Sequence, residues 1–107
     1  MATDTIPTTI TLEAAALAKE YGVERELDAI LDKGREMVAG LRAMEVEVEP
    51  WAEEDDVCVV VRGVIDPAYR DDPSFGAWYR WPVDHLPHPV WDRIRITSML
   101  DETPHGR

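Results

Sequence analysis

Residues 56–65 read Asp-Val-Cys-Val-Val-Val-Arg-Gly-Val-Ile, the longest β-branched stretch in the chain. From residue 57 onward, Arg62 is its only charged member. A run this short and this branched does not suit an amphipathic helix and is typical of a strand covered on both faces. We therefore expect residues 56–65 to form the central strand of a sheet. Nothing in the stretch is chemically reactive by design, so it predicts where the core lies and not what the protein does.

Two helices are expected before this strand. Thr11 suits the N-cap of the first helix, and Gly22 suits its C-terminal cap. The second helix is expected over residues 24–43, because apolar residues recur there at offsets of three and four. This apolar stripe consists of Leu27, Ile30, Leu31, Gly34, Met37, Val38, Leu41 and Met44. Glycine inside a helix costs about 1 kcal/mol relative to alanine, so Gly34 indicates that another group approaches closely there.

An acidic strand is expected next to the central strand. From residue 45 the period changes to two, because Glu45, Glu47 and Glu49 alternate with valines. The loop at residues 51–56 leads back into the central strand, which predicts a β-hairpin. Residues 45–56 hold seven acids and no base, so the hairpin is expected to carry an acidic outer face.

The C-terminal part predicts a short helix and a last strand. After a polar loop at residues 66–73, aromatic residues spaced three and four apart predict a helix over 75–81, which Pro82 kinks or ends. Residues 93–100 alternate and predict a strand, although a helix over residues 89–100 is the alternative.

The predicted order of elements is ααββαβ. Such an order predicts a two-layer α+β fold, in which an N-terminal αα-hairpin precedes a small mixed sheet with an intervening short helix. At 107 residues the chain fits one domain. We expect this domain to cover residues 1–107, with flexible tails at 1–10 and 102–107.

The charge balance constrains the class of partner. The formal net charge is −11, from 22 acids against 11 bases. This balance opposes binding to nucleic acid and to anionic membranes, because both need clustered Lys and Arg. A basic protein partner is favoured instead, with plain solubility as the alternative explanation.

The expected compartment is the cytosol. Cys58 is the only cysteine and cannot form an internal disulfide, which favours a reducing compartment. The N-terminus has no basic region followed by an apolar segment, as a signal peptide would. No apolar stretch approaches the ~20 residues that span a bilayer.

Residues 21–27 (Tyr-Gly-Val-Glu-Arg-Glu-Leu), the acidic hairpin and residues 89–96 (Pro-Val-Trp-Asp-Arg-Ile-Arg-Ile) carry a resemblance over most of the chain. Together they resemble a family of small, acidic, uncharacterised bacterial proteins. Pro82 and Pro87 depart from the smoother helix expected in that family. The resemblance implies a bacterial cytosolic protein encoded beside a partner, and it supplies no catalytic residues.

Residues 15–27 also look like the first helix and turn of a helix-turn-helix. The would-be recognition helix, however, opens with Glu24, Glu26 and Asp28. These carboxylates would be repelled by a phosphate groove, so an αα-hairpin is the better interpretation.

Few residues suit catalysis or metal binding. His85 and His88, with Asp84, could ligate a transition metal, but prolines make their segment irregular and no further ligand has recognisable spacing. Cys58, flanked by valines, suits a small core residue better than a nucleophile. We expect no metal and no cofactor. A small enzyme or metal-dependent protein remains the rival hypothesis, with a site around Asp71, Asp72, His85 and His88.

The leading hypothesis is a non-catalytic protein–protein interaction module, an accessory or antitoxin-like subunit. Four tryptophans in a chain with one phenylalanine either fill the core or form part of an interface. A homo-oligomer is left open. The hypothesis assigns the interaction surface to Glu45, Glu47, Glu49, Glu53, Glu54, Asp55, Trp78 and Trp81.

Overall fold

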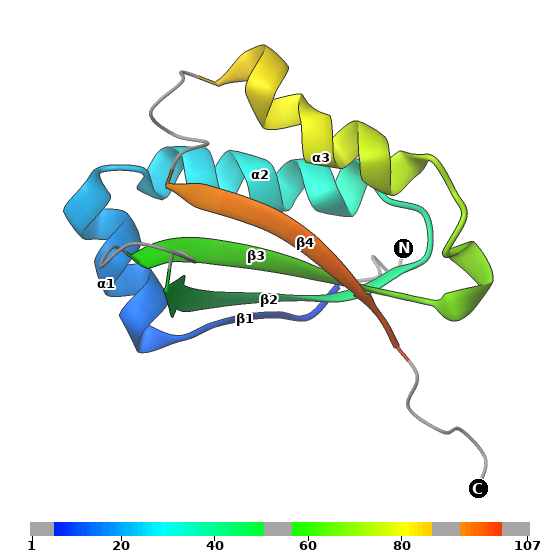
Figure 1. Ribbon diagram of the computed structural model, residues 1–107, viewed down its shortest axis with the longest axis horizontal. Helices are drawn as coiled ribbons and strands as arrows, with labels where there is room; N and C mark the ends of the chain where they lie inside the picture. The colour runs from blue at the N-terminus through cyan, green and yellow to red at the C-terminus, as the bar shows by residue number, and fades with distance from the viewer. Residues whose placement is uncertain (1–5, 51–56, 87–92, 102–107) are drawn as a thin grey trace, which may run out of the picture.

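The fold is a two-layer α+β arrangement. The structure is a computed structural model that describes residues 6–50, 57–86 and 93–101. Four strands form one sheet in the order β1-β2-β3-β4, and Figure 1 shows the helices packed together on one face of it. The strands are β1 (Thr8–Ile10), β2 (Leu41–Pro50), β3 (Val57–Ile65) and β4 (Ile94–Leu100). This confirms the predicted fold class.

The sheet is mixed. β2 and β3 are antiparallel, whereas β1 runs parallel to β2 and β4 runs parallel to β3. β3 therefore has a paired strand on each side, which confirms it as a central strand. The structure also decides between the two alternatives for the last element, because residues 94–100 form a strand.

The first helix begins and ends with recognisable local signals. Helix α1 (Leu12–Tyr21) is capped by Thr11, whose Oγ1 accepts a hydrogen bond from the Ala14 N–H at 3.1 Å. Gly22 follows α1 with a φ of 71°, in the left-handed region that glycine adopts without strain. Helix α2 (Glu24–Met37) comes next. The predicted αα-hairpin is thus present.

Helix α2 ends earlier than predicted. The expected helix over residues 24–43 stops at Met37, and Leu41 and Met44 belong to β2. Gly40 adopts a φ of 74° between the two elements, and its lack of a side chain leaves room for the Tyr69 ring. The helix was predicted too long because Leu41 and Met44, two buried positions of β2, continue the apolar spacing of the helix by coincidence.

Thr8–Ile10 was expected to be part of a flexible tail, and this prediction is wrong. These residues form β1, and the pairing is extended by hydrogen bonds on both sides. Met44 N–H donates to the Pro7 carbonyl at 2.9 Å, and Thr11 N–H donates to the Val46 carbonyl at 3.0 Å. The strand depends on contacts with residues more than 30 positions away, which local sequence does not encode. The predicted tail at 102–107 lies outside the described residues.

The C-terminal helix is longer than predicted. A 3-10 turn (Pro67–Tyr69) is followed by helix α3 (Ser74–His85). Pro82 does not end α3, because the helix continues past it to His85. The side chain of Pro82 is buried.

The helices cover only one face of β3. Val59 and Val61 point into the apolar cluster beneath the helices. A strand covered on both faces would also bury Val64 in a core, but Val64 points to the opposite face, where it pairs with Ala43. The register shifts between Leu41 and Ala43, which places Arg42 as an extra residue on β2. A strand covered on both faces was expected, and the helices cover only one of the two faces of β3.

Candidate interaction surface

The candidate surface is the sheet face that the helices leave uncovered, which we call the open face. Successive residues of a strand point to opposite faces, so the buried residues Met44 and Val46 place their neighbours on the open face. Glu45, Glu47 and Glu49 therefore lie there in one line along β2, and we call them the carboxylate row.

One arginine holds the whole carboxylate row. Arg62 on β3 lies directly opposite Glu45 in the sheet register. Its Nη1 lies 3.3 Å from Glu45 Oε1 and 3.4 Å from Glu47 Oε2, while its Nη2 lies 2.9 Å from Glu49 Oε2. The single charge within β3 is therefore a counter-ion for three acids of the neighbouring strand.

The carboxylates remain accessible while the cation lies deeper. The side chains of Glu45, Glu47 and Glu49 are 40%, 42% and 40% exposed, whereas that of Arg62 is 21% exposed. Partial burial alone would lower the pKa of Arg62, but its hydrogen bond with Glu45 and the charges of Glu47 and Glu49 outweigh burial and raise it. The guanidinium therefore stays charged. The four groups carry a surplus of negative charge that faces solvent.

This geometry changes one expectation. Three neighbouring carboxylates without a counter-ion would repel one another until a basic partner arrived. Arg62 relieves that repulsion within the free protein. The row is also ordered by these contacts, because each glutamate is held at one end by the same guanidinium.

Cys58 is a buried residue of the open face. Burial raises the pKa of its thiol, and the nearby Arg95 offsets this only in part. A thiol with a raised pKa is mostly protonated near neutral pH and is a poor nucleophile. The geometry agrees with the interpretation of Cys58 as a packing residue.

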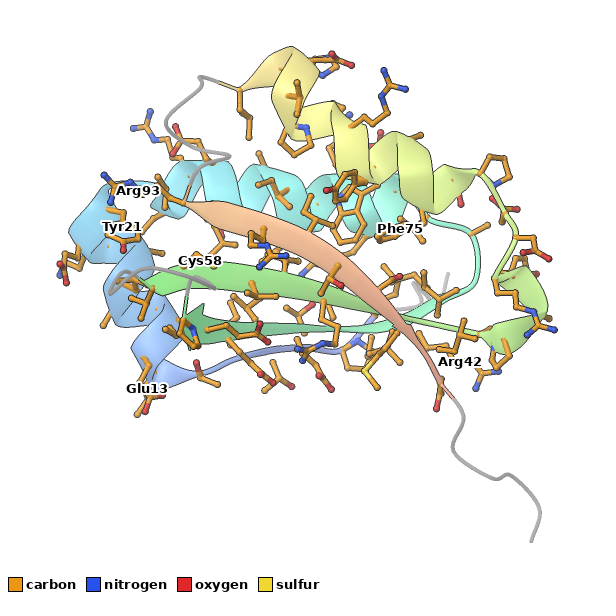
Figure 2. All side chains as sticks on the ribbon, viewed as in Figure 1. Glu13, Tyr21, Arg42, Cys58, Phe75 and Arg93 are labelled. Carbon is orange, nitrogen blue, oxygen red and sulfur yellow. The ribbon has the colours of Figure 1, made fainter. Side chains whose placement is uncertain are left out.

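A second charged cluster fastens one end of the sheet, and sequence reasoning missed it. Arg42 Nη2 lies 2.8 Å from Asp66 Oδ2, and Arg42 Nη1 lies 3.4 Å from Asp101 Oδ2. The hydrogen bond with Asp66 is the main cause of the raised pKa of Arg42. Figure 2 shows Arg42 at the end of the sheet where β4 finishes. Only the register shift on β2 places Arg42 there, so its spacing in the sequence gave no signal.

The two described tryptophans of the predicted surface differ in burial. Trp78 is 0% exposed, and its Nε1 donates a hydrogen bond to the Ile30 carbonyl at 2.8 Å. The assignment of Trp78 to the interaction surface is therefore wrong, because a fully buried side chain cannot contact a partner. Trp81 is half-buried, stacks on His85 at 4.9 Å between ring centroids, and lies under the Lys33 ammonium at 5.8 Å.

The described residues of the rival enzyme site, Asp71, Asp72 and His85, do not converge. Asp72 accepts a hydrogen bond from the Ser74 N–H at 2.9 Å, just before α3, and its interaction with Ser74 lowers the pKa of Asp72. His85 is the last residue of α3. A helix of this length separates its ends by about 18 Å. Asp71 is exposed, and His88 lies outside the described residues.

Several predicted features cannot be placed. Glu53, Glu54 and Asp55 lie outside the described residues.

Across residues 6–50, 57–86 and 93–101, no group of three or more His, Cys, Asp or Glu side chains could hold a metal ion. Within the same part of the chain, every helix is too short or too polar to cross a membrane.

Comparison of the chain with protein-family models, with curated proteins and with solved structures finds no match. The case for a function therefore rests on the geometry of the open face.

Proposed function

We propose that the chain is a non-catalytic interaction module that binds a basic segment of a partner protein on its open face, as a cytoplasmic accessory or antitoxin-like subunit. The observation that supports this most is the carboxylate row held by Arg62. Three half-exposed carboxylates stand in line on a sheet face that none of the described helices covers.

The row is prepared for binding before a partner arrives. Glutamate loses side-chain freedom when it is ordered, at a cost of about 1–2 kcal/mol per residue. Here the contacts with Arg62 already restrict Glu45, Glu47 and Glu49 in the free protein. A partner that binds pre-ordered carboxylates loses less free energy to ordering.

The spacing of the row suggests the shape of the bound segment. Alternate residues of a strand lie about 7 Å apart on one face. An extended partner segment with Lys or Arg at every second position repeats at the same interval. The net charge of −11 would also speed the approach of such a segment at low salt.

Among the described residues, nothing favours the enzyme hypothesis in the same way. Asp72 accepts a hydrogen bond from the Ser74 N–H at the start of α3, and His85 lies at the far end of that helix. The thiol of Cys58 is buried.

The proposal can be tested by affinity purification from cells that naturally express the protein, followed by quantitative mass spectrometry. The test variant carries glutamine at all three positions of the carboxylate row, and we call it the sheet-face variant. Glutamine keeps the size of each side chain and removes its charge, so the fold should be retained.

A matched control separates local from overall charge. The control, which we call the helix variant, carries glutamine in place of Glu13, Glu20 and Glu24, which are exposed on α1 and α2. Both variants lose the same net charge. A partner captured by the wild type and the helix variant but lost with the sheet-face variant supports the proposal. A partner captured equally by both variants contradicts it.

A further inference from the structure

Strand β4 presents a long backbone edge. It pairs with β3 along all seven of its residues, and no described residue pairs with its other side. Proteins commonly protect such edges with prolines, lysines, bulges or very short strands. The opposite edge of the sheet is protected in this way, since β1 has three residues and follows Pro7. β4 contains neither proline nor lysine, and its register with β3 is uninterrupted.

The hydrogen bonds to β3 define which groups of β4 face outward. Val59 N–H donates to the Arg93 carbonyl at 3.0 Å, and Asp101 N–H donates to the Ile65 carbonyl at 2.8 Å. In a parallel pair, the residues of one strand alternate between facing the neighbour and facing away. The odd-numbered residues 93–101 therefore face β3. The outward N–H and C=O groups belong to Ile94, Ile96, Ser98 and Leu100.

These outward groups are complementary to a second copy of the same strand. When two β4 strands pair antiparallel about an axis at Thr97, Ile94 faces Leu100 and Ile96 faces Ser98. All four outward residues of each strand then exchange hydrogen bonds, about eight in total. Sliding the pair by two residues in either direction leaves outward groups without a partner at both ends.

The side chains match in the same register. In this register residue 93 of one copy lies opposite residue 101 of the other, so opposite charges lie near each other at both ends of the pair. In the single chain the Arg93 guanidinium lies over the Tyr21 ring of α1, 4.3 Å from the ring centroid, and it must turn away from that ring to meet Asp101 of the other copy. Asp101 retains its contact with Arg42 at 3.4 Å, and Figure 2 shows Arg93 and Arg42 at opposite ends of the sheet. Arg95 lies opposite Met99, whose exposed fraction is 46% in the single chain. The aliphatic part of Arg95 can cover this methionine.

We propose that β4 is a homodimer edge, at which two copies of the chain pair antiparallel about Thr97 into one continuous eight-stranded sheet. The two open faces then lie on the same side of that sheet. This interface uses β4 only, and it is independent of the partner proposed for the carboxylate row.

The first test is the mass of the wild-type chain in solution. One copy has a mass of 12.1 kDa. Sedimentation velocity over about 1–200 µM covers the range in which weak homodimers assemble. The expected result is a species of twice the monomer mass that grows with concentration. A monomer throughout this range overturns the proposal.

The register is tested by cysteine cross-linking with Cys58→Ala as the background. The two Thr97 residues face each other at the axis as a non-hydrogen-bonded pair, with Cα atoms about 4.5 Å apart, which a disulfide can span. Thr97→Cys should therefore form a covalent dimer under mild oxidation. Met99→Cys is the matched control, because the two copies of residue 99 lie about 13 Å apart along the pair. Equal cross-linking at both positions overturns the register.

A third variant removes outward hydrogen bonds. Ser98→Pro deletes one outward donor from an exposed position without removing a hydrogen bond to β3. It should sediment as a monomer with an unchanged circular-dichroism spectrum. A Ser98→Pro protein that still forms the wild-type amount of dimer contradicts the proposal. If Ser98→Pro fails to fold, the comparison of Thr97→Cys with Met99→Cys tests the proposed pairing without it.

Discussion

Trp78 packs against the backbone of Gly34 so closely that a Cβ atom at position 34 would lie 2.8 Å from Trp78 Cζ2. The same indole fills the space above Gly63 of β3, where an added Cβ would lie 3.2 Å from Trp78 Cζ3. Two glycines, one on α2 and one on the sheet, thus make room for one large side chain from α3. This contact joins the helical layer to the sheet beneath it.

We expect Gly34→Ala to destabilise the protein, although alanine is the better helix former. The helix gains about 1 kcal/mol from the substitution. The clash with a buried indole that cannot move away should cost about 2–3 kcal/mol, as overpacking in a close-packed core does. The net loss should appear in urea unfolding followed by circular dichroism.

Gly76→Ala on α3 is the matched control for that substitution. No heavy atom lies within 4 Å of a Cβ built at position 76. The control should therefore stabilise the protein by about 0.5–1 kcal/mol through helix propensity alone. If Gly34→Ala were equally stabilising, the close contact with Trp78 would be wrong.

Arg62→Met should lower stability because it removes the shared counter-ion of the carboxylate row. Methionine keeps much of the packing of the arginine stem, so the effect reports mainly on charge. We expect a loss of about 1–2 kcal/mol in low salt, from three ion pairs and the repulsion they relieve. The loss should shrink as added salt screens the carboxylates.

Arg35→Met is the control for Arg62→Met. Arg35 is an arginine of α2 that forms one ion pair, with Asp32 at 2.8 Å, and donates one exposed hydrogen bond to Thr8 Oγ1 at 3.0 Å. Its removal should change stability by less than about 0.5 kcal/mol. A loss of stability as large as that of Arg62→Met would mean that an arginine shared by three carboxylates stabilises the protein no more than an arginine paired with one.

The stability contributed by Asp72 should depend on pH. Its hydrogen bond with Ser74 lowers the pKa of Asp72 below the ordinary value of 3.8 in the folded state. A lowered folded-state pKa contributes stability that is present above the unfolded-state pKa and is lost as pH falls through the folded-state pKa. The difference in unfolding free energy between the wild type and Asp72→Ala should therefore be largest near pH 7.

That gap should close as pH falls through the lowered folded-state pKa of Asp72. Urea titrations at a series of pH values measure it, with Asp71→Ala as a control for the loss of one exposed charge. A gap that stayed constant from neutral to acidic pH would show that the carboxylate does not act through its charge.

The elements with strong local signals were predicted correctly from the sequence. Thr11 marks the start of α1 through its side-chain hydroxyl, which accepts a hydrogen bond from the Ala14 N–H, and Gly22 marks the end through its left-handed backbone. The β-branched run at 57–65 does form a central strand. Gly34 was expected to mark a close approach, and Trp78 is the group that approaches.

The elements that depend on distant contacts were not predicted. β1 has three residues and exists only through its pairing with β2. The end of α2 was misplaced because Leu41 and Met44 continue its apolar spacing while facing the same core from a strand. Val64 was assigned to the core because the β-branched run predicted a strand covered on both faces, whereas alternation from Val59 and Val61 places Val64 on the open face.

The candidate surface was also predictable only in part. The alternation of Glu45, Glu47 and Glu49 predicted one acidic face, and the structure places them on one face. Which residue would face them depends on the register between β2 and β3, so the role of Arg62 could not be foreseen. The spacing of Trp78 and Trp81 likewise did not reveal which of the two is buried.

The most direct test of the proposed function is the affinity of a purified partner for three proteins at two salt concentrations. Isothermal titration calorimetry would compare the wild type, the sheet-face variant and the helix variant. We predict that the sheet-face variant binds at least about tenfold more weakly, that the helix variant binds within about threefold of the wild type, and that added salt weakens the wild-type complex. Equal affinities of the two variants, together with indifference to salt, would contradict the account.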